Sequence, residues 1–164
     1  MERVVNRLIE LNKKVATMES CTGGGVADAI TSIEGSSQII GYSAVTYSNE
    51  AKIMVGVNPE IIEKYTVYSS EVAREMARVI SIVANADYGI GITGKLNRAD
   101  ENNMYGADNQ VFYSIYDKAL DTYYTYSIVV TEETRPLNKK LVIDNIEQKF
   151  MEVLKQKTYG YKKN

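Results

Sequence analysis

The segment 15–33 constrains the fold most, because it joins an extended run to a helical pattern through a short glycine turn. Val15-Ala-Thr-Met is apolar and β-branched enough to form a strand, and apolar residues at helical spacing begin at Val26. Glu19-Ser-Cys-Thr-Gly-Gly lies between them. A hydroxyl on this turn faces a helix N-terminus, where backbone N–H groups and the helix dipole favour negative charge. The segment therefore predicts a strand–turn–helix unit that presents Ser20 at the end of a strand.

Strand and helix patterns interleave along the rest of the chain. Pro59 suits the first position of a helix, and serine or asparagine residues near 48 and 69 can cap helices on either side of it. We expect helices over about 4–11, 22–33, 70–83 and 136–155, short helices that begin near 49 and 59, and strands over 15–18, 39–47, 88–93, 111–116 and 123–130. The last two strands predict an antiparallel hairpin. The order of elements predicts one α/β domain with a mixed sheet over residues 1–157 and a flexible tail at 158–164.

The overall composition limits the class of protein. The net charge of −2 argues against a dedicated nucleic-acid-binding face, and the single cysteine excludes an intrachain disulfide. The chain shows no secretory leader, no apolar run long enough to cross a bilayer and no Cys/His cluster that could hold a metal. We therefore expect a soluble, cytoplasmic protein with no membrane or nucleic-acid partner and no bound metal.

Residues 89–95 match two nucleotide-binding patterns by their letters alone. Gly89-Ile-Gly-Ile-Thr-Gly fits the dinucleotide fingerprint, and the run to Lys95 nearly fits a P-loop. In both motifs the glycines follow a strand and open a helix, whereas here they lie inside the expected strand, and Leu96 replaces the hydroxyl residue that would bind magnesium. The pattern favours close backbone packing or a strand end that lines a substrate. A magnesium-dependent NTPase is the least supported function.

Ser20 would need a base other than histidine to act as a nucleophile, because the chain contains no histidine. Alone, its turn is explained at least as well by tight packing and by capping of the next helix, for which Thr22 is the candidate. Cys21 fits a small buried residue better than a nucleophile, since only the helix terminus could stabilise its thiolate. Lys52 follows a segment rich in hydroxyl and amide groups, residues 42–49, at an expected strand-to-helix junction. If that junction neighbours Ser20, burial and a helix N-terminus would lower the pKa of Lys52 and make it a base for the serine hydroxyl.

Four motifs occur in a characteristic order and spacing: Glu19-Ser-Cys-Thr-Gly-Gly, Gly35-Ser-Ser, Val45-Thr-Tyr-Ser-Asn-Glu-Ala-Lys and Ile92-Thr-Gly. In this they resemble the C-terminal domain of the competence/damage-inducible protein CinA, over about residues 3–155. The resemblance implies a single-domain, three-layer α/β/α fold and a homo-oligomer. It also implies the activity of the nicotinamide-nucleotide amidases of this family, which hydrolyse the carboxamide of nicotinamide mononucleotide to the acid and ammonia, with no cofactor.

The resemblance also implies roles for residues by position. Ser20 would be the nucleophile and Lys52 its general base. Ser37 would position the reacting groups or supply an oxyanion donor, and Tyr47 would support Lys52. A small-molecule nucleotide would be bound by Thr22, Gly23, Gly24, Thr93, Gly94, Arg135 and Lys139.

The second half of the chain departs from the family pattern. After Thr93-Gly94 the family continues with Ala-Gly-Pro and a glycine-rich loop, whereas this chain has the polar stretch 95–108. Lys139 stands where the family has the second arginine of a Gly-Asp-Arg-x-x-x-Arg pattern, and lysine cannot copy the two-pronged contact of arginine with phosphate. The alternative to an amidase is therefore a nucleotide-binding or assembly module that keeps the fold without catalysis.

Overall fold

Five strands form one mixed sheet in the computed structural model, which describes residues 1–160 and the side chains of residues 1–155. The strands are β1 (Val15–Glu19), β2 (Ser43–Val45), β3 (Tyr88–Gly94), β4 (Gln110–Asp117) and β5 (Thr122–Val129). Their order across the sheet is β2-β1-β3-β4-β5. β1, β2 and β3 are parallel, and β4 pairs antiparallel with both β3 and β5. The expected mixed sheet and hairpin are confirmed.

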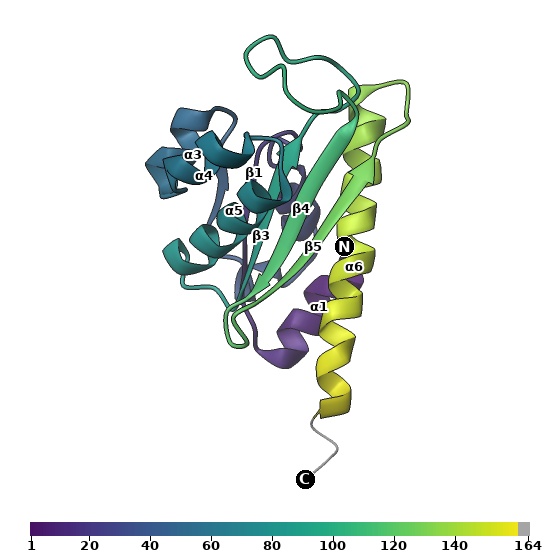
Figure 1. The fold of residues 1–164 in the computed structure, drawn as a ribbon. Coiled ribbons are helices and arrows are strands. Elements are labelled where there is room, and N and C mark those ends of the chain that lie inside the picture. Colours follow the sequence, from purple (N-terminus) through teal and green to yellow (C-terminus); the bar gives the residue numbers. More distant parts are fainter. Residues whose placement is uncertain (161–164) are drawn as a thin grey trace.

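Helices cover both faces of the sheet, as Figure 1 shows. On one face lie α3 (Asn49–Val55), α4 (Pro59–Tyr65) and α5 (Ser70–Val83), and on the other lie α1 (Glu2–Leu11), α2 (Gly25–Thr31) and α6 (Arg135–Gly160). Each face has its own apolar core, with Met76 and Ile80 of α5 in one and Leu8 and Phe150 of α1 and α6 in the other. The molecule is thus a three-layer α/β/α domain.

Two glycines of β3 are needed for contact with α5. A side chain at Gly89 would begin 1.9 Å from the carbonyl oxygen of Ala77, and one at Gly91 would begin 2.3 Å from that of Ala73. Both glycines therefore let the helix backbone approach the strand. Close packing explains the glycine pattern at 89–95, and neither nucleotide-binding motif is present, because no helix follows β3.

Local capping explains where the helices on the α5 face begin. The side chains of Ser48, Asn58 and Ser69 accept hydrogen bonds from backbone N–H groups in the first turns of α3, α4 and α5. Each bond satisfies a donor that has no partner within the helix. These starts agree with the sequence prediction.

Two boundaries differ from the expected ones. The strand expected over 39–47 is reduced to β2, because the 3-10 turn at Ser36–Gln38 directs Ile39 into the core, where its carbonyl accepts the N–H of Val15 at 2.8 Å. α6 continues to Gly160, so residues 158–160 of the expected tail are helical. Residues 161–164 of that tail lie outside the described residues.

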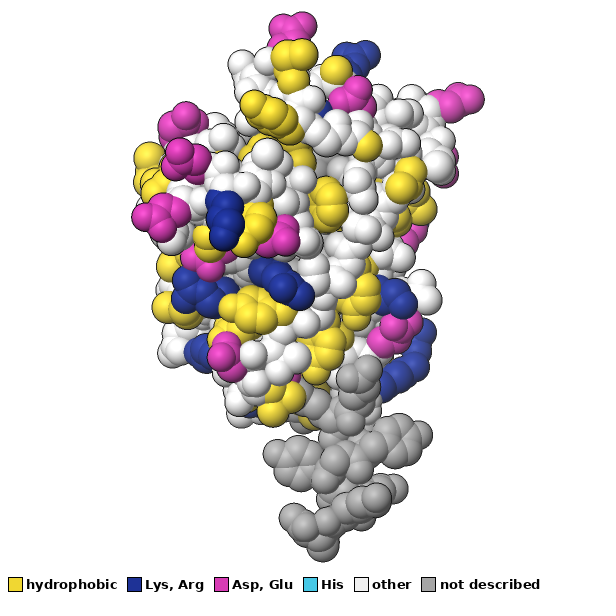
Figure 2. All heavy atoms as spheres, in the orientation of Figure 1, with side chains coloured by type: hydrophobic (Ala, Val, Ile, Leu, Met, Phe, Trp, Pro, Cys, Tyr) yellow, Lys and Arg dark blue, Asp and Glu magenta, His cyan; other side chains and the backbone are white. Residues whose placement is uncertain are grey.

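Charged side chains of both signs are mixed over the face of the molecule drawn in Figure 2. Neither sign gathers into a continuous stripe on that face, in keeping with the net charge of −2. Among residues 1–160, no helix combines the length and the apolar character that a membrane span requires.

The path of the chain creates a crevice at one edge of the sheet. β1 connects to β2 through α2 on one face, and β2 connects to β3 through α3, α4 and α5 on the other. β2 and β3 therefore lie on opposite sides of β1, which makes the carboxyl end of β1 a topological switch point. Ligands of open α/β sheets bind outside the strand ends at such points.

Candidate active site

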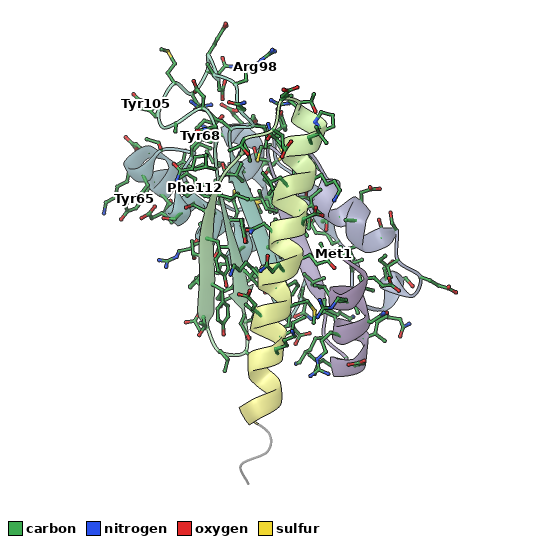
Figure 3. All side chains as sticks on the ribbon, turned by 90° about the vertical axis from the view of Figure 1, so that its right-hand side faces the viewer. Met1, Tyr65, Tyr68, Arg98, Tyr105 and Phe112 are labelled. Atoms are coloured by element: carbon green, nitrogen blue, oxygen red, sulfur yellow. The ribbon has the colours of Figure 1, made fainter. Side chains whose placement is uncertain are left out.

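A cleft of about 680 Å³ lies at this edge of the sheet. Ser20 and Cys21 line it from the end of β1, and Arg135 lines it from the start of α6. The other lining side chains come from residues 47–50, from Tyr68 before α5, and from most of residues 94–103. In Figure 1 the loop between β3 and β4 arches over this end of the molecule, and Figure 3 shows Tyr68 and Arg98 at the same end.

Ser20 and Lys52 are in direct contact beside the cleft. The Ser20 N–H donates to the carbonyl of Ile92 in β3 at 3.0 Å, which holds the serine at the end of the central strands. Lys52 Nζ lies 3.3 Å from Ser20 Oγ and also donates to the carbonyls of Thr46 at 2.9 Å and Ser48 at 3.4 Å. The lysine side chain is only 1% exposed. Lys52 belongs to α3, whose N-terminus is capped by the side chain of Ser48.

Burial sets the protonation behaviour of this pair. Removal of the ammonium group from water lowers the pKa of Lys52 to about 8, although the negative charge of Glu50 acts in the opposite direction. Burial also raises the pKa of the Cys21 thiol to about 12, so this cysteine stays protonated at neutral pH. A fraction of Lys52 is therefore neutral near pH 7 and able to accept a proton, whereas Cys21 is a neutral thiol.

Glu19, which the sequence analysis did not single out, holds the turn that carries Ser20. Its buried carboxylate accepts hydrogen bonds from the hydroxyls of Thr17 and Thr22 and from the backbone N–H groups of Val26 and Ala27. A carboxylate inside the protein is stable only with such partners. The signal available in the sequence was an acidic residue next to a glycine turn and a helix start.

Thr22 does not have the expected role. Its hydroxyl donates to Glu19 Oε1 at 2.7 Å, its side chain is buried, and it neither caps α2 nor lines the cleft. Glu19 caps α2 in its place. Gly23 and Gly24 adopt left-handed conformations in the turn, with φ of 61° and 93°. Lys139 Nζ lies 3.2 Å from where a side chain at Gly23 would begin, so this lysine is next to the turn but outside the cleft lining.

The remaining expected binding residues divide into two groups. Gly94 and Arg135 line the cleft together with Tyr47, whose hydroxyl accepts a hydrogen bond from the Arg135 guanidinium at 3.0 Å. Tyr47 is 64% exposed and contacts Arg135 rather than Lys52. Thr93 is fully buried and donates to the carbonyl of Val67 at 2.8 Å, so its hydroxyl holds the backbone before Tyr68 and does not face the cleft.

Ser37 lies at the opposite end of the sheet from Ser20, which corrects the role expected for it. It belongs to the turn at Ser36–Gln38 and lines a separate small hollow of about 90 Å³ with Lys14 and Val15. Val15 begins β1, whereas Ser20 follows its last residue. Ser37 therefore cannot touch the groups that react at Ser20.

Several residues of the cleft come from the polar stretch after β3, where the chain departs from the family pattern. Lys95 is buried and forms an ion pair with Asp108 at 3.1 Å. The hydroxyl of Tyr68 donates to the carboxylate of Asp100. Within the described part of the chain, no group of three or more Cys, Asp or Glu residues could hold a metal ion.

Comparison with known proteins agrees with this architecture. Residues 1–104 match the family model described as the CinA C-terminal domain. The chain belongs to the CinA family. The match covers more than half of the chain and includes Ser20 and Lys52.

Similar proteins extend the comparison to the whole fold. A crystal structure of a CinA superfamily protein from Klebsiella pneumoniae has a TM-score of 0.86 over 94% of this chain and 95% of its own, at 24% sequence identity. A second, from Escherichia coli, has a TM-score of 0.75 over 87% and 81%, at 28% identity. A protein of Thermoanaerobacter pseudethanolicus, provisionally named competence-damage inducible protein, is 46% identical over 96 residues, which are 57% of this chain and 23% of that protein. The matched region thus spans about a quarter of that curated relative.

Proposed function

We propose that this CinA-family protein is an amidohydrolase in which Ser20 is the nucleophile and Lys52 is the general base. The observation that carries the proposal is the contact of 3.3 Å between Lys52 Nζ and Ser20 Oγ, next to a cleft and with a buried lysine whose pKa is lowered to about 8. This distance is within the looser geometry that a catalytic pair has before substrate tightens it. A lysine with such a pKa can be neutral in a useful fraction at neutral pH.

The proposed reaction moves one proton back and forth between the pair and the substrate. Neutral Lys52 takes the hydroxyl proton as Ser20 Oγ attacks the carboxamide carbon and forms a tetrahedral intermediate. Protonated Lys52 then gives that proton to the departing nitrogen, so the C–N bond breaks and ammonia leaves an ester on Ser20. Lys52 then deprotonates a water molecule, which attacks the ester carbon. The bond from this carbon to Ser20 Oγ breaks as Lys52 returns the proton to Oγ, which releases the carboxylic acid and restores the free serine. The backbone N–H groups that follow Ser20 on the turn are the candidates for stabilising the oxyanion.

Nicotinamide mononucleotide is the first substrate to test. It has the carboxamide that the mechanism needs, and the family resemblance includes nicotinamide-nucleotide amidases. The names of the matched relatives state no reaction. A related small carboxamide would react with the same pair. The loop between β3 and β4, which lines the cleft, would then determine which carboxamide is preferred. Homo-oligomer formation and a cytoplasmic location stay predictions.

The experiment measures ammonia released from nicotinamide mononucleotide by the purified protein. Ser20→Ala and Lys52→Met are expected to lose activity by about 10³-fold or more, as expected for members of one catalytic unit. Ser37→Ala is the matched control, because it removes the same hydroxyl at the far end of the sheet, and it is expected to leave the rate unchanged. Rapid quenching and peptide mass spectrometry are expected to detect the acyl group on Ser20.

The alternative function is nucleotide binding without turnover, and the departure of the 95–108 stretch from the family pattern is the observation that favours it. Calorimetric binding of a nucleotide by a wild-type protein that releases no ammonia from a panel of carboxamides would support this alternative and contradict the amidase.

A further inference from the structure

The loop between β3 and β4 forms one wall of the cleft that Ser20 faces. Residues 95–109 connect the end of β3 to the start of β4, and most of residues 95–103 line the cleft. At the base of the loop the Lys95 N–H donates to the carbonyl of Gln110 at 3.0 Å, and the Arg98 N–H donates to that of Asp108 at 3.1 Å. The backbone therefore fixes the two ends of the loop. Its middle has one backbone bond, from the Asn103 N–H to the carbonyl of Asp100 at 3.2 Å, and is otherwise held by side-chain contacts.

Tyr68 holds the middle of the loop through Asp100. The tyrosine hydroxyl donates to Asp100 Oδ2, and the same carboxylate accepts from the Asn102 N–H at 3.0 Å and from Asn103 Nδ2 at 3.3 Å. Asp100 is thus the point where the loop folds on itself and joins Tyr68. The hydrogen bond from Tyr68 lowers the pKa of Asp100, so the carboxylate is charged at neutral pH and the contact weakens only in acid.

The position of Tyr68 is itself set by the core. The buried hydroxyl of Thr93, near the end of β3, donates to the carbonyl of Val67, the residue before Tyr68. On its other side, the ring of Tyr68 lies 5.2 Å from Lys95 Nζ, whose ion pair with Asp108 holds the return of the loop. A continuous series of contacts therefore leads from β3 through Tyr68 to Asp100.

We infer that Tyr68 is a positioning residue that fixes the 95–109 loop as the substrate-selecting wall of the cleft. The inference has two parts: Tyr68 orders the loop, and the ordered loop selects the substrate. The second part rests on the proposed amidase function, whereas the first is independent of any reaction. Tyr68 lines the cleft, yet its hydroxyl is bonded to Asp100, so it acts through the loop and takes no part in proton transfer at Ser20. A loop held in this way presents Asn102 and Asn103 to the ligand in one arrangement.

The first test measures hydrogen–deuterium exchange in the protein of residues 1–164 without ligand. Tyr68→Phe keeps the ring and removes the hydroxyl, and amides of residues 98–107 are expected to exchange about tenfold faster, because a hydrogen bond to a charged acceptor is lost. Tyr105→Phe is the matched control, since Tyr105 is in the same loop, 70% exposed and outside the cleft lining. Equal exchange in Tyr68→Phe and wild type would overturn the inference.

The second test separates substrate selection from chemistry. With nicotinamide mononucleotide, Tyr68→Phe is expected to raise KM about tenfold and to change kcat less than twofold, while Tyr105→Phe changes neither. A fall in kcat at constant KM would overturn the positioning role. If the wild-type protein released no ammonia from any carboxamide, the proposed function would fail, while the exchange measurement would still decide whether Tyr68 orders the loop.

Discussion

The two walls of the cleft are held in place by different kinds of contact. The wall that carries Ser20 depends on the sheet, through the backbone bond to Ile92 and the four hydrogen bonds of buried Glu19. The opposite wall, residues 95–109, has few backbone bonds and also depends on side chains that are partly exposed, such as Asp108 at 54%. From this comparison we predict that changes in the loop leave Ser20 and Lys52 in place and alter which ligand is bound.

The largest expected effect comes from Lys52, because it contacts Ser20 on the wall built on the sheet and its burial has a free-energy cost. Its pKa in the folded protein, about 8, is below the ordinary value of 10.5, so the folded state holds the proton less tightly than the unfolded state. Buried Lys52 therefore lowers the free energy of unfolding below pH 8, and this penalty disappears as the pH rises from about 8 to 10.5. At pH 7, Lys52→Met is expected to abolish turnover and to raise the free energy of unfolding by about 2–3 kcal/mol.

Denaturant unfolding at pH 7 and at pH 10 checks this prediction, with Lys64→Met on the exposed surface of α4 as the control. The gain from Lys52→Met should shrink at the higher pH. A variant that is less stable than wild type at both values would show that the lysine stabilises the fold.

The next effect is expected from Glu19→Gln. All four groups bonded to the Glu19 carboxylate act as donors, and a glutamine would turn an NH2 group toward two of them. We expect a loss of about 1–3 kcal/mol in the free energy of unfolding. Since the turn carries Ser20, kcat should also fall by about 10–100-fold. Glu60→Gln in the first turn of α4 is the control, because Glu60 lacks these bonds. An unchanged kcat in Glu19→Gln would show that the Glu19 carboxylate does not position Ser20.

The pH dependence of turnover is expected to follow Lys52. The neutral amine is the active form, so the lowered pKa predicts that kcat rises about tenfold per unit below pH 8 and becomes level above it. Steady-state rates with nicotinamide mononucleotide between pH 6 and 9.5 measure the profile. A profile that is flat across pH 8 would contradict Lys52 as the base. Tyr68→Phe should leave this apparent pKa unchanged, because it alters only the other wall.

The smallest effect is expected from Lys95→Met. Methionine fills the same buried space, and the lost ion pair has a partner, Asp108, that is half in solvent. We expect a change below about 1 kcal/mol in the free energy of unfolding, since such pairs contribute little. KM should rise a few-fold with kcat unchanged. Thermal unfolding and ammonia release measure the two quantities, and a loss of kcat comparable with that of Glu19→Gln would show that the two walls are not independent.

Local patterns in the sequence predict much of this molecule. The caps at Ser48 and Ser69 act between neighbouring residues, and β4 and β5 are paired strands joined by a short turn, so both features are visible in a single segment. The role expected for Ser37 at the active site was wrong for a different reason. Its distance from Ser20 depends on the path between α2 and β2, and no local pattern contains that path.

The sequence by itself determined the strand–turn–helix unit around Ser20, the absence of histidine and the candidacy of Lys52, because these follow from residue type and spacing. Only the tertiary structure decided that Lys52 meets Ser20 in a buried contact, that Glu19 rather than Thr22 caps α2, and that Tyr68 reaches Asp100. The physical reason is that burial and proximity are properties of the whole fold. The parallel strands bring groups far apart in the chain to one edge, and exclusion of water there changes the pKa of the amine.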